Sequence, residues 1–164
     1  MLYIIWNIIL ICVWWDQKGI IYYELLNPKE TINASIYSRQ LTSLSQALDI
    51  KRPNGGNSKR KVILLHDNAR PHVAKVIKET IENLGWEVLS HPVYSPDLAP
   101  SDYHLFRSMA HFFRDKIFFD IESIKKEVAQ YFGFKSLSFY EKGIKSLLKR
   151  WEKVIASDGN YFDD

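Results

Sequence analysis

The stretch KVILLHDNARPHVAKVIKETIENLGWEVL, residues 61–89, decides the fold of this chain. It opens on a mostly apolar run that predicts a strand over about 61–66, and it closes on a run that predicts another strand at about 86–90. Between them, apolar residues recur at helical spacing over about 71–84. A strand, a crossover helix and a second strand make a βαβ unit with a parallel pair, so we expect an α/β fold.

The expected helix has both of its ends marked. Pro71 suits a first turn, where its missing N–H needs no partner, and Gly85 suits the left-handed position that ends a helix. The residues expected on its buried face are Val73, Val76, Ile77, Thr80, Ile81 and Leu84.

Two aspartates are the strongest candidates for chemistry. Asp67 directly follows the first of these strands, and the carboxyl ends of strands are where working groups gather in open α/β sheets. Asp102 opens an amphipathic segment after a Pro-rich loop, with 34 residues between the two (68–101). A carboxylate at a strand's end and another at a helix's start can converge on one divalent metal, so we expect the two to lie within about 8 Å of each other. The pair predicts metal-dependent phosphoryl transfer on nucleic acid.

The two neighbours of Asp67 leave alternatives open. His66 and Asn68 can orient the Asp67 carboxylate or meet a phosphate, or they can be buried and capping polar residues. Two further acids are weaker candidates for a third metal ligand. Asp97, between Pro96 and Leu98, is typical of a turn.

Asp16 is the other weak candidate, because it lies in the tetrapeptide DQKG between two β-rich runs. Gly19 supplies the positive φ that such hairpins often need. We expect a hairpin with strands at about 8–15 and 20–26, in which Asp16 makes local turn hydrogen bonds.

The amino-terminal run is unusually apolar. Fourteen of residues 1–15 are apolar, the exception being Asn7. A run this short falls below the roughly 18 to 20 residues that cross a bilayer as a helix, and the first basic residue is Lys18, so neither a membrane span nor a signal peptide is expected. A buried strand fits better. The single cysteine, Cys12, excludes an internal disulfide and favours a reducing compartment.

The remaining periodic segments predict helices. The first starts near Thr31, and its buried face is expected to comprise Tyr37, Leu41, Leu44 and Leu48. Ser101 is expected to be the N-cap of a helix over about 101–113, with an apolar face of Tyr103, Phe106, Met109, Ala110 and Phe113. Helices are also expected at about 121–132 and 138–156, the latter with an apolar face of Tyr140, Ile144, Leu147, Leu148, Trp151 and Ile155.

Composition and charge restrict the function only weakly. At 164 residues, with 46% hydrophobic and 25% charged, the chain can bury one core, and we expect one domain. A net charge of +3 is compatible with a nucleic-acid partner without requiring one. The basic segment Lys51–Lys61 predicts a mobile loop that either contacts DNA or is only solvated. The same two alternatives apply to the basic residues of the last helix, Lys142, Lys145, Lys149 and Arg150.

The histidines do not predict a zinc site. They lie in separate segments and lack a cysteine or aspartate partner at zinc-ligand spacing. The four considered are His72, His91, His104 and His111.

Four segments together resemble the mariner transposase family. HDNARPH (His66–His72) is similar to the family's second catalytic motif, and YSPDLAPSDYHLF (Tyr94–Phe106) is similar to its third, at the family's spacing. WWDQKGIIYYELL (Trp14–Leu26) and RWEKVIASDGNYF (Arg150–Phe162) also match in family order. The resemblance covers roughly residues 12–162, which leaves residues 1–9 as possibly foreign sequence.

This resemblance implies a ribonuclease-H-like fold, a mixed sheet with flanking helices. It implies that Asp67 and Asp102 are the second and third catalytic aspartates, which bind Mg²⁺ or Mn²⁺, with two ions in the intact family. The implied partner is DNA, as inverted-repeat transposon ends and a TA target, with pairing to a second copy or to full-length transposase, in the nucleus. No membrane partner is expected.

The family's first catalytic aspartate lies on the central first strand, some forty residues before the WWDQ segment, so we expect it to fall outside this chain. The helix-turn-helix domains are expected to be absent as well. We therefore expect an incomplete catalytic domain without turnover of its own. The alternative is a non-catalytic relic that binds DNA or pairs with transposase, whereas the YSPDLAPSD string disfavours a ribonuclease-H-like nuclease outside transposition. The apolar run Met1–Val13 is expected to pair in place of the missing strand.

Overall fold

The computed structural model describes the backbone of residues 2–5, 9–53, 61–92 and 95–156, with side chains from residue 9 onward. The chain forms two compact units. The first unit comprises Met1–Trp14 and Ile20–Tyr94, and the second comprises Trp15–Gly19 and Ser95–Asp164.

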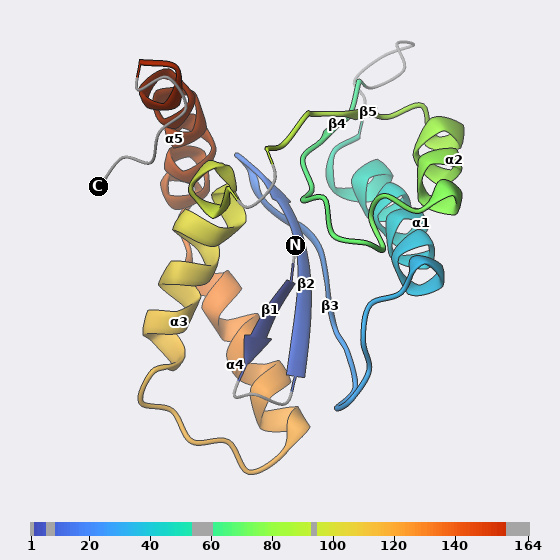
Figure 1. Cartoon of the computed structure of the whole chain (residues 1–164). Helices are drawn as coiled ribbons and strands as arrows, with labels where there is room; N and C mark the ends of the chain where they lie inside the picture. Colours follow the sequence, from blue (N-terminus) through green and yellow to red (C-terminus); the bar gives the residue numbers. More distant parts are fainter. Residues whose placement is uncertain (1, 6–8, 54–60, 93–94, 157–164) are drawn as a thin grey trace. The chain divides into compact units, whose positions relative to one another are not determined.

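A three-stranded sheet is formed by the amino-terminal part of the chain (Figure 1). Its strands, in the spatial order β1-β2-β3, are β1 (Leu2–Ile5), β2 (Ile9–Asp16) and β3 (Gly19–Leu25). The expected hairpin of β2 and β3 is confirmed, but the apolar run of residues 1–15 contributes to two strands, β1 and β2, and not to one. β1 pairs antiparallel with β2, Leu2 lying opposite Cys12 and Ile5 opposite Ile9. β1 therefore pairs with the edge of β2 that β3 leaves open. That it takes the place of the missing central strand stays a prediction.

Asp16 stabilises the turn between β2 and β3. Its Oδ1 accepts a hydrogen bond from the Lys18 amide at 2.8 Å, and Gly19 has a φ of +115°. Asp16 thus makes the local hydrogen bond expected of a turn residue.

Helix α1 (Ala34–Lys51) supplies much of the core of the first unit. Asn33 caps it, because its Oδ1 accepts a hydrogen bond from the Ile36 amide at 2.9 Å. The four residues expected on its apolar face are all buried. They pack with residues of the sheet and of the βαβ unit in a cluster that includes Cys12, Trp14, Ile21, Leu26, Leu64, Ile77 and Ile81.

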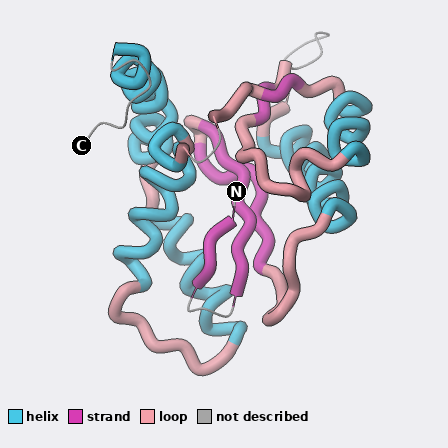
Figure 2. Tube along the Cα trace, in the orientation of Figure 1, coloured by secondary structure: helices cyan, strands magenta, loops and turns pink. Residues whose placement is uncertain are grey.

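The expected βαβ unit is present, but its strands are short. β4 (Ile63–Leu64) and β5 (Glu87–Val88) are parallel, and α2 (Lys75–Leu84) connects them. The ladder extends only as far as the amides of Glu87 and Leu89, which donate to the carbonyls of Val62 and Leu64 at 2.9 and 2.8 Å. Loops make up the rest of the predicted strands (Figure 2). Helices α1 and α2 lie side by side (Figure 1), with Ser38 Oγ 2.9 Å from Thr80 Oγ1.

The prediction that this helix begins near Pro71 is wrong. The carbonyl of Ala69 accepts hydrogen bonds from the amides of His72 and Val73 at 2.8 and 3.3 Å, which closes a separate turn. Ala74 then takes an extended conformation with ψ 145°, so α2 starts only at Lys75. The delay changes the buried face: Val73 and Val76 are each 46% exposed. Gly85 ends the helix as expected, with a φ of +69°.

The second unit is helical. Its elements are the 3-10 turn η1 (Pro96–Leu98), the π-helix η2 (Ser101–Phe106), α3 (Arg107–Phe113), α4 (Ile121–Phe134) and α5 (Leu137–Ala156). The predicted N-cap at Ser101 is wrong, because Ser101 Oγ accepts a hydrogen bond from Trp15 Nε1 at 2.9 Å and Pro100 precedes the first turn. The π-helical turn also changes the phase of the apolar face, which buries Leu105, Phe106 and Met109.

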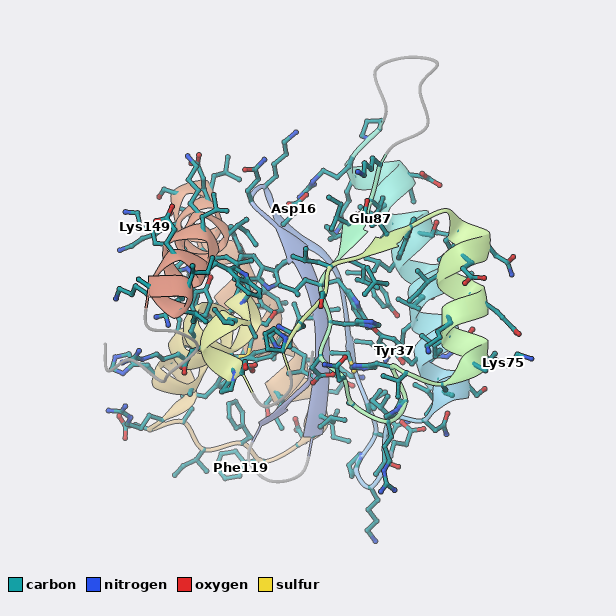
Figure 3. The ribbon with its side chains drawn as sticks, turned by 45° about the horizontal axis from the view of Figure 1, so that its top comes forward. Asp16, Tyr37, Lys75, Glu87, Phe119 and Lys149 are labelled. Carbon is teal, nitrogen blue, oxygen red and sulfur yellow. The ribbon has the colours of Figure 1, made fainter. Side chains whose placement is uncertain are left out.

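The apolar face predicted for α5 is partly wrong. Tyr140 is buried as expected, but Leu148 and Ile155 are 70% and 72% exposed. The helix instead buries Gly143, which lies against the rings of His104 and Trp15. Lys149 points away from α5 (Figure 3).

Three expectations fall wholly or partly outside the described residues. They concern the interior of the basic loop (54–60), the start of the third motif (93–94) and the end of the last motif (157–162). Among the described helices, none combines the length and the apolar character needed to cross a membrane.

Candidate catalytic site

Asp67 is the third residue after β4, and the described hydrogen bonds to its carboxylate go to one of its two oxygens. Oδ1 accepts hydrogen bonds from His72 Nδ1 at 2.5 Å and from the Ala69 amide at 3.1 Å. The side chain remains 41% exposed. The hydrogen bond from His72 lowers the pKa of Asp67 to about 2, against the opposing effect of partial burial. Asp67 is therefore ionised at neutral pH and partly open to solvent, as a ligand of a hard cation must be.

His72 is a site residue that the sequence did not single out. Its side chain is only 1% exposed, and Nδ1 also lies 3.2 Å from the Asp67 backbone oxygen. The turn closed by the Ala69 carbonyl reverses the direction of the chain. The side chain of His72, five residues after Asp67, therefore faces the Asp67 carboxylate. The spacing of Asp and His around Pro71 is the only sequence feature that points to this contact.

His66 is a core residue. It is 8% exposed, and its Nδ1 is hydrogen-bonded to Tyr37 Oη at 2.9 Å. Its ring stacks on that of His72 at 5.1 Å, with 9° between the planes. Burial lowers the pKa of His66 to about 4, with a further contribution from His72. Of the alternatives left open by the sequence, the buried polar role fits His66, which supports His72 from behind.

Asn68 ties two segments of the first unit together. Its Nδ2 donates to the backbone oxygen of His91 at 2.7 Å, which fixes the loop after β5 beside the Asp67 segment. Burial lowers the pKa of His91, while the negative charge of Asp67 acts in the opposite direction. His91 Nδ1 is buried without a hydrogen-bond partner in the part of the chain that the structure describes.

Asp102 lies in the first turn of the π-helix η2, in the second unit. Its amide donates to the Ala99 carbonyl at 2.8 Å. The neighbouring residues anchor this turn, since Tyr103 Oη donates to the Gly143 carbonyl at 2.7 Å and Trp15 bonds to Ser101. π-Helical turns are rare and frequently occur at functional sites, so the local geometry supports a special role for this segment.

Arg150 anchors the loop before Asp102. Its guanidinium lies 4.2 Å from the centroid of the Tyr103 ring, and Nη1 donates to the Asp97 carbonyl at 3.3 Å. Asp97 therefore lies in a 3-10 turn held by α5. The other three basic residues considered on this helix are exposed, and Lys145 pairs with Glu141 at 2.6 Å. For them, DNA contact stays a prediction.

The two aspartates belong to different units, so their convergence also stays a prediction. The ionised, partly exposed Asp67 carboxylate fits a divalent cation. Within the described ranges, no group of three or more His, Cys, Asp or Glu side chains is placed to hold a metal ion.

Comparisons with known proteins place these features in context. A family model described as Transposase (partial DDE domain) matches residues 7–57. The Mariner Mos1 transposase of Drosophila mauritiana is 51% identical over 154 residues, which is 94% of this chain. The chain spans 45% of the length of that relative.

Solved structures give the same result at the level of the fold. The Mos1 transposase catalytic domain with raltegravir and Mn has a TM-score of 0.92 and 53% identity, with 94% of this chain and 78% of that chain covered. The Mos1 mariner paired-end complex with Mn has a TM-score of 0.90 and 53% identity, with 94% and 45% covered. The expected α/β ribonuclease-H-like fold is thereby confirmed.

Proposed function

This chain belongs to the mariner family of transposases, and on that premise we propose that it carries part of a metal-dependent centre for DNA strand cleavage and transfer. The observation that carries the proposal is the Asp67 carboxylate, which is ionised, partly exposed and oriented by two hydrogen bonds in the loop after the parallel strand β4. The substrate is DNA, as transposon ends and their target. The place of action is the nucleus.

The proposed cofactor is Mg²⁺ or Mn²⁺, with Asp67 and Asp102 as ligands. When bound, such ions activate a water molecule and stabilise the leaving oxygen of a phosphodiester. The chain's own part is to present fixed anionic oxygens. Asp67 does so from the loop after β4, and Asp102 from the first turn of η2. The Ala69 amide donates a hydrogen bond to Asp67 Oδ1, and the Asp102 amide donates one to the Ala99 carbonyl.

Two aspartates bind one hard cation weakly, and bridging two ions normally needs a further ligand. We therefore propose that this polypeptide alone does not turn over DNA. The second candidate function, a module that binds DNA or pairs with another transposase copy, is favoured by the absence of a third clustered ligand among the described residues.

The test has a binding arm and a cleavage arm. Mn²⁺ binding is measured by the loss of the electron paramagnetic resonance signal of free Mn²⁺, in wild type, Asp67→Ala and Asp102→Ala. Wild type should bind, and each variant should bind at least about tenfold more weakly. Wild-type binding that survives in both variants would overturn the proposed site.

The cleavage arm uses labelled DNA with mariner-type ends and Mg²⁺ or Mn²⁺. The expected result is neither nicking nor joining. Metal-dependent cutting that disappears in Asp67→Ala and Asp102→Ala would overturn the proposed inactivity. Asp16→Ala and Asp97→Ala would then show whether either residue supplies the third ligand.

A further inference from the structure

The contact between His72 and Asp67 is more specific than metal binding by a carboxylate requires. His72 Nδ1 lies 2.5 Å from Asp67 Oδ1 and 3.2 Å from the backbone oxygen of the same residue. An ionised carboxylate only accepts hydrogen bonds, so Nδ1 must carry the proton and act as the donor. One N–H group thus faces both the side chain and the main chain of Asp67.

The imidazole of His72 is itself packed against two other rings, which also contact each other. Its ring centroid lies 4.1 Å from that of Tyr37 and 5.1 Å from that of His66. Tyr37 projects from α1 into the core of the first unit (Figure 3) and is hydrogen-bonded to His66. The His72 amide is held by the Ala69 carbonyl at 2.8 Å. Rotation of the His72 ring would break this stack, so its donor stays directed at Asp67.

The consequence for Asp67 is an asymmetric carboxylate. Both of its hydrogen bonds go to Oδ1, and among the described residues none goes to Oδ2. The donors fix the side-chain rotamer without occupying the second oxygen. We propose that His72 is a positioning residue, which presets the Asp67 carboxylate so that Oδ2 is the oxygen that binds the divalent cation. This inference rests on the proposed function, because it requires Asp67 to be a metal ligand.

Two substitutions of His72 distinguish a positioning role from a purely structural one. The amide nitrogen of asparagine can occupy the place of imidazole Nδ1, whereas phenylalanine keeps the aromatic stack and removes the donor. A purely structural role for His72 predicts that His72→Phe is tolerated at least as well as His72→Asn. A positioning role predicts the reverse order in metal affinity.

The experiment measures Mn²⁺ affinity in wild type, His72→Asn, His72→Phe, Asp67→Ala and the control His111→Asn. The control lies on α3 in the second unit, where His111 is exposed. His72→Phe should weaken binding about 10- to 100-fold, the usual effect of removing a group that orients a metal ligand, and His72→Asn should recover most of it. His111→Asn should bind as wild type does.

A second readout does not involve metal. The hydrogen bond to the Asp67 carboxylate should shift the His72 Nδ1–H proton downfield in the nuclear magnetic resonance spectrum, and Asp67→Ala should abolish that shift. This readout still tests the hydrogen bond between His72 and Asp67 if His72→Phe fails to fold, because it uses only wild type and Asp67→Ala.

The outcomes separate the two proposals. Wild-type affinity in His72→Phe, with binding lost in Asp67→Ala, would overturn the role of His72 and leave the metal site intact. An absent downfield resonance would also overturn it. Binding that is unaffected in Asp67→Ala would overturn the proposed function itself.

Discussion

At the level of single residues, a stack of aromatic side chains places the charge of Asp67. Tyr37, His66 and His72 lie behind the carboxylate, and only the last of them touches it. Burial raises the pKa of Tyr37 well above its usual value, so the hydroxyl stays protonated beside His66. His66 and Tyr37 are therefore uncharged at neutral pH, whereas the Asp67 carboxylate is ionised.

His66 should make stability depend on pH. Its folded pKa is about 4, whereas an exposed histidine has a value near 6.5, so the unfolded chain binds a proton first as pH falls. This contribution is fully present above about pH 6.5 and is lost as pH falls towards 4. Between pH 7 and pH 5 the loss should be about 2 kcal/mol.

The measurement is the free energy of unfolding in urea at pH 7 and pH 5, for wild type and His66→Asn. The asparagine amide can keep a hydrogen bond to Tyr37 but does not titrate. The acid-induced loss should therefore shrink in the variant. An equal loss in both proteins would assign the pH dependence to other groups, of which His91 and His104 also have pKa values lowered by burial.

The sequence indicates the two aspartates and their neighbours His66 and Asn68 as candidates, but it does not indicate the contact between His72 and Asp67. Asp67 is recognisable because it follows an apolar run, and Asp102 because it opens an amphipathic one. The role of His72 depends on the turn that the Ala69 carbonyl closes. The sequence around Pro71 is equally compatible with the first turn of a helix, which was the structure expected there. Residues in a loop follow neither the helical nor the strand periodicity, so the sequence pattern does not predict where the His72 side chain points.

At the level of elements, the second unit depends on a close approach of α5 to η2. A Cβ atom added at Gly143 would lie 2.5 Å from His104 Cδ2 and 2.8 Å from Trp15 Cη2. His104 has little freedom to move, because its Nε2 is hydrogen-bonded to the Phe139 carbonyl at 2.8 Å. The same face of α5 receives the Tyr103 hydroxyl. Periodicity misjudged this face because a glycine, and not an apolar side chain, makes the contact.

Gly143→Ala should therefore destabilise the protein although alanine favours helices. Overpacking of this kind costs about 1–3 kcal/mol, which outweighs the gain of up to about 1 kcal/mol from helix propensity. Gly133→Ala on α4 is the matched control, since an added Cβ meets nothing within 4 Å there. Thermal denaturation should give a lower Tm for Gly143→Ala and an unchanged or higher Tm for Gly133→Ala. Two equal shifts would contradict the close contact.

The short strand β1 is a second element with a testable role. It pairs with β2 from Leu2 opposite Cys12 to Ile5 opposite Ile9, along the edge that β3 leaves open. Removing residues 2–8 should expose that edge, and an unpaired apolar edge promotes association between chains. Size-exclusion chromatography should show oligomers, and Tm should fall by about 5 °C or more. A monomeric variant that melts cooperatively at the wild-type temperature would contradict this role.

At the level of the whole molecule, the candidate centre is divided between two compact units. Asp67 belongs to the unit built on α1 and the sheet, and Asp102 belongs to the helical unit. Each aspartate has its own local support, from His72 in one case and from the anchored η2 turn in the other. Local patterns in the sequence indicate each aspartate separately, whereas their convergence on one metal would depend on long-range packing that no local pattern encodes, and it stays a prediction.

Shared ligation of one cation requires the two carboxylates to approach within about 8 Å. In the double variant Asp67→Cys, Asp102→Cys, a bifunctional thiol reagent of that span should form an intramolecular cross-link, detected by the mass of the intact chain. The native thiol should not interfere, because Cys12 is buried and burial raises its pKa. Each single variant should take up the reagent at one end only. If both cysteines of the double variant are instead fully labelled at one end of the reagent only, the two aspartates do not converge. That result would contradict the assignment of one metal site to this pair.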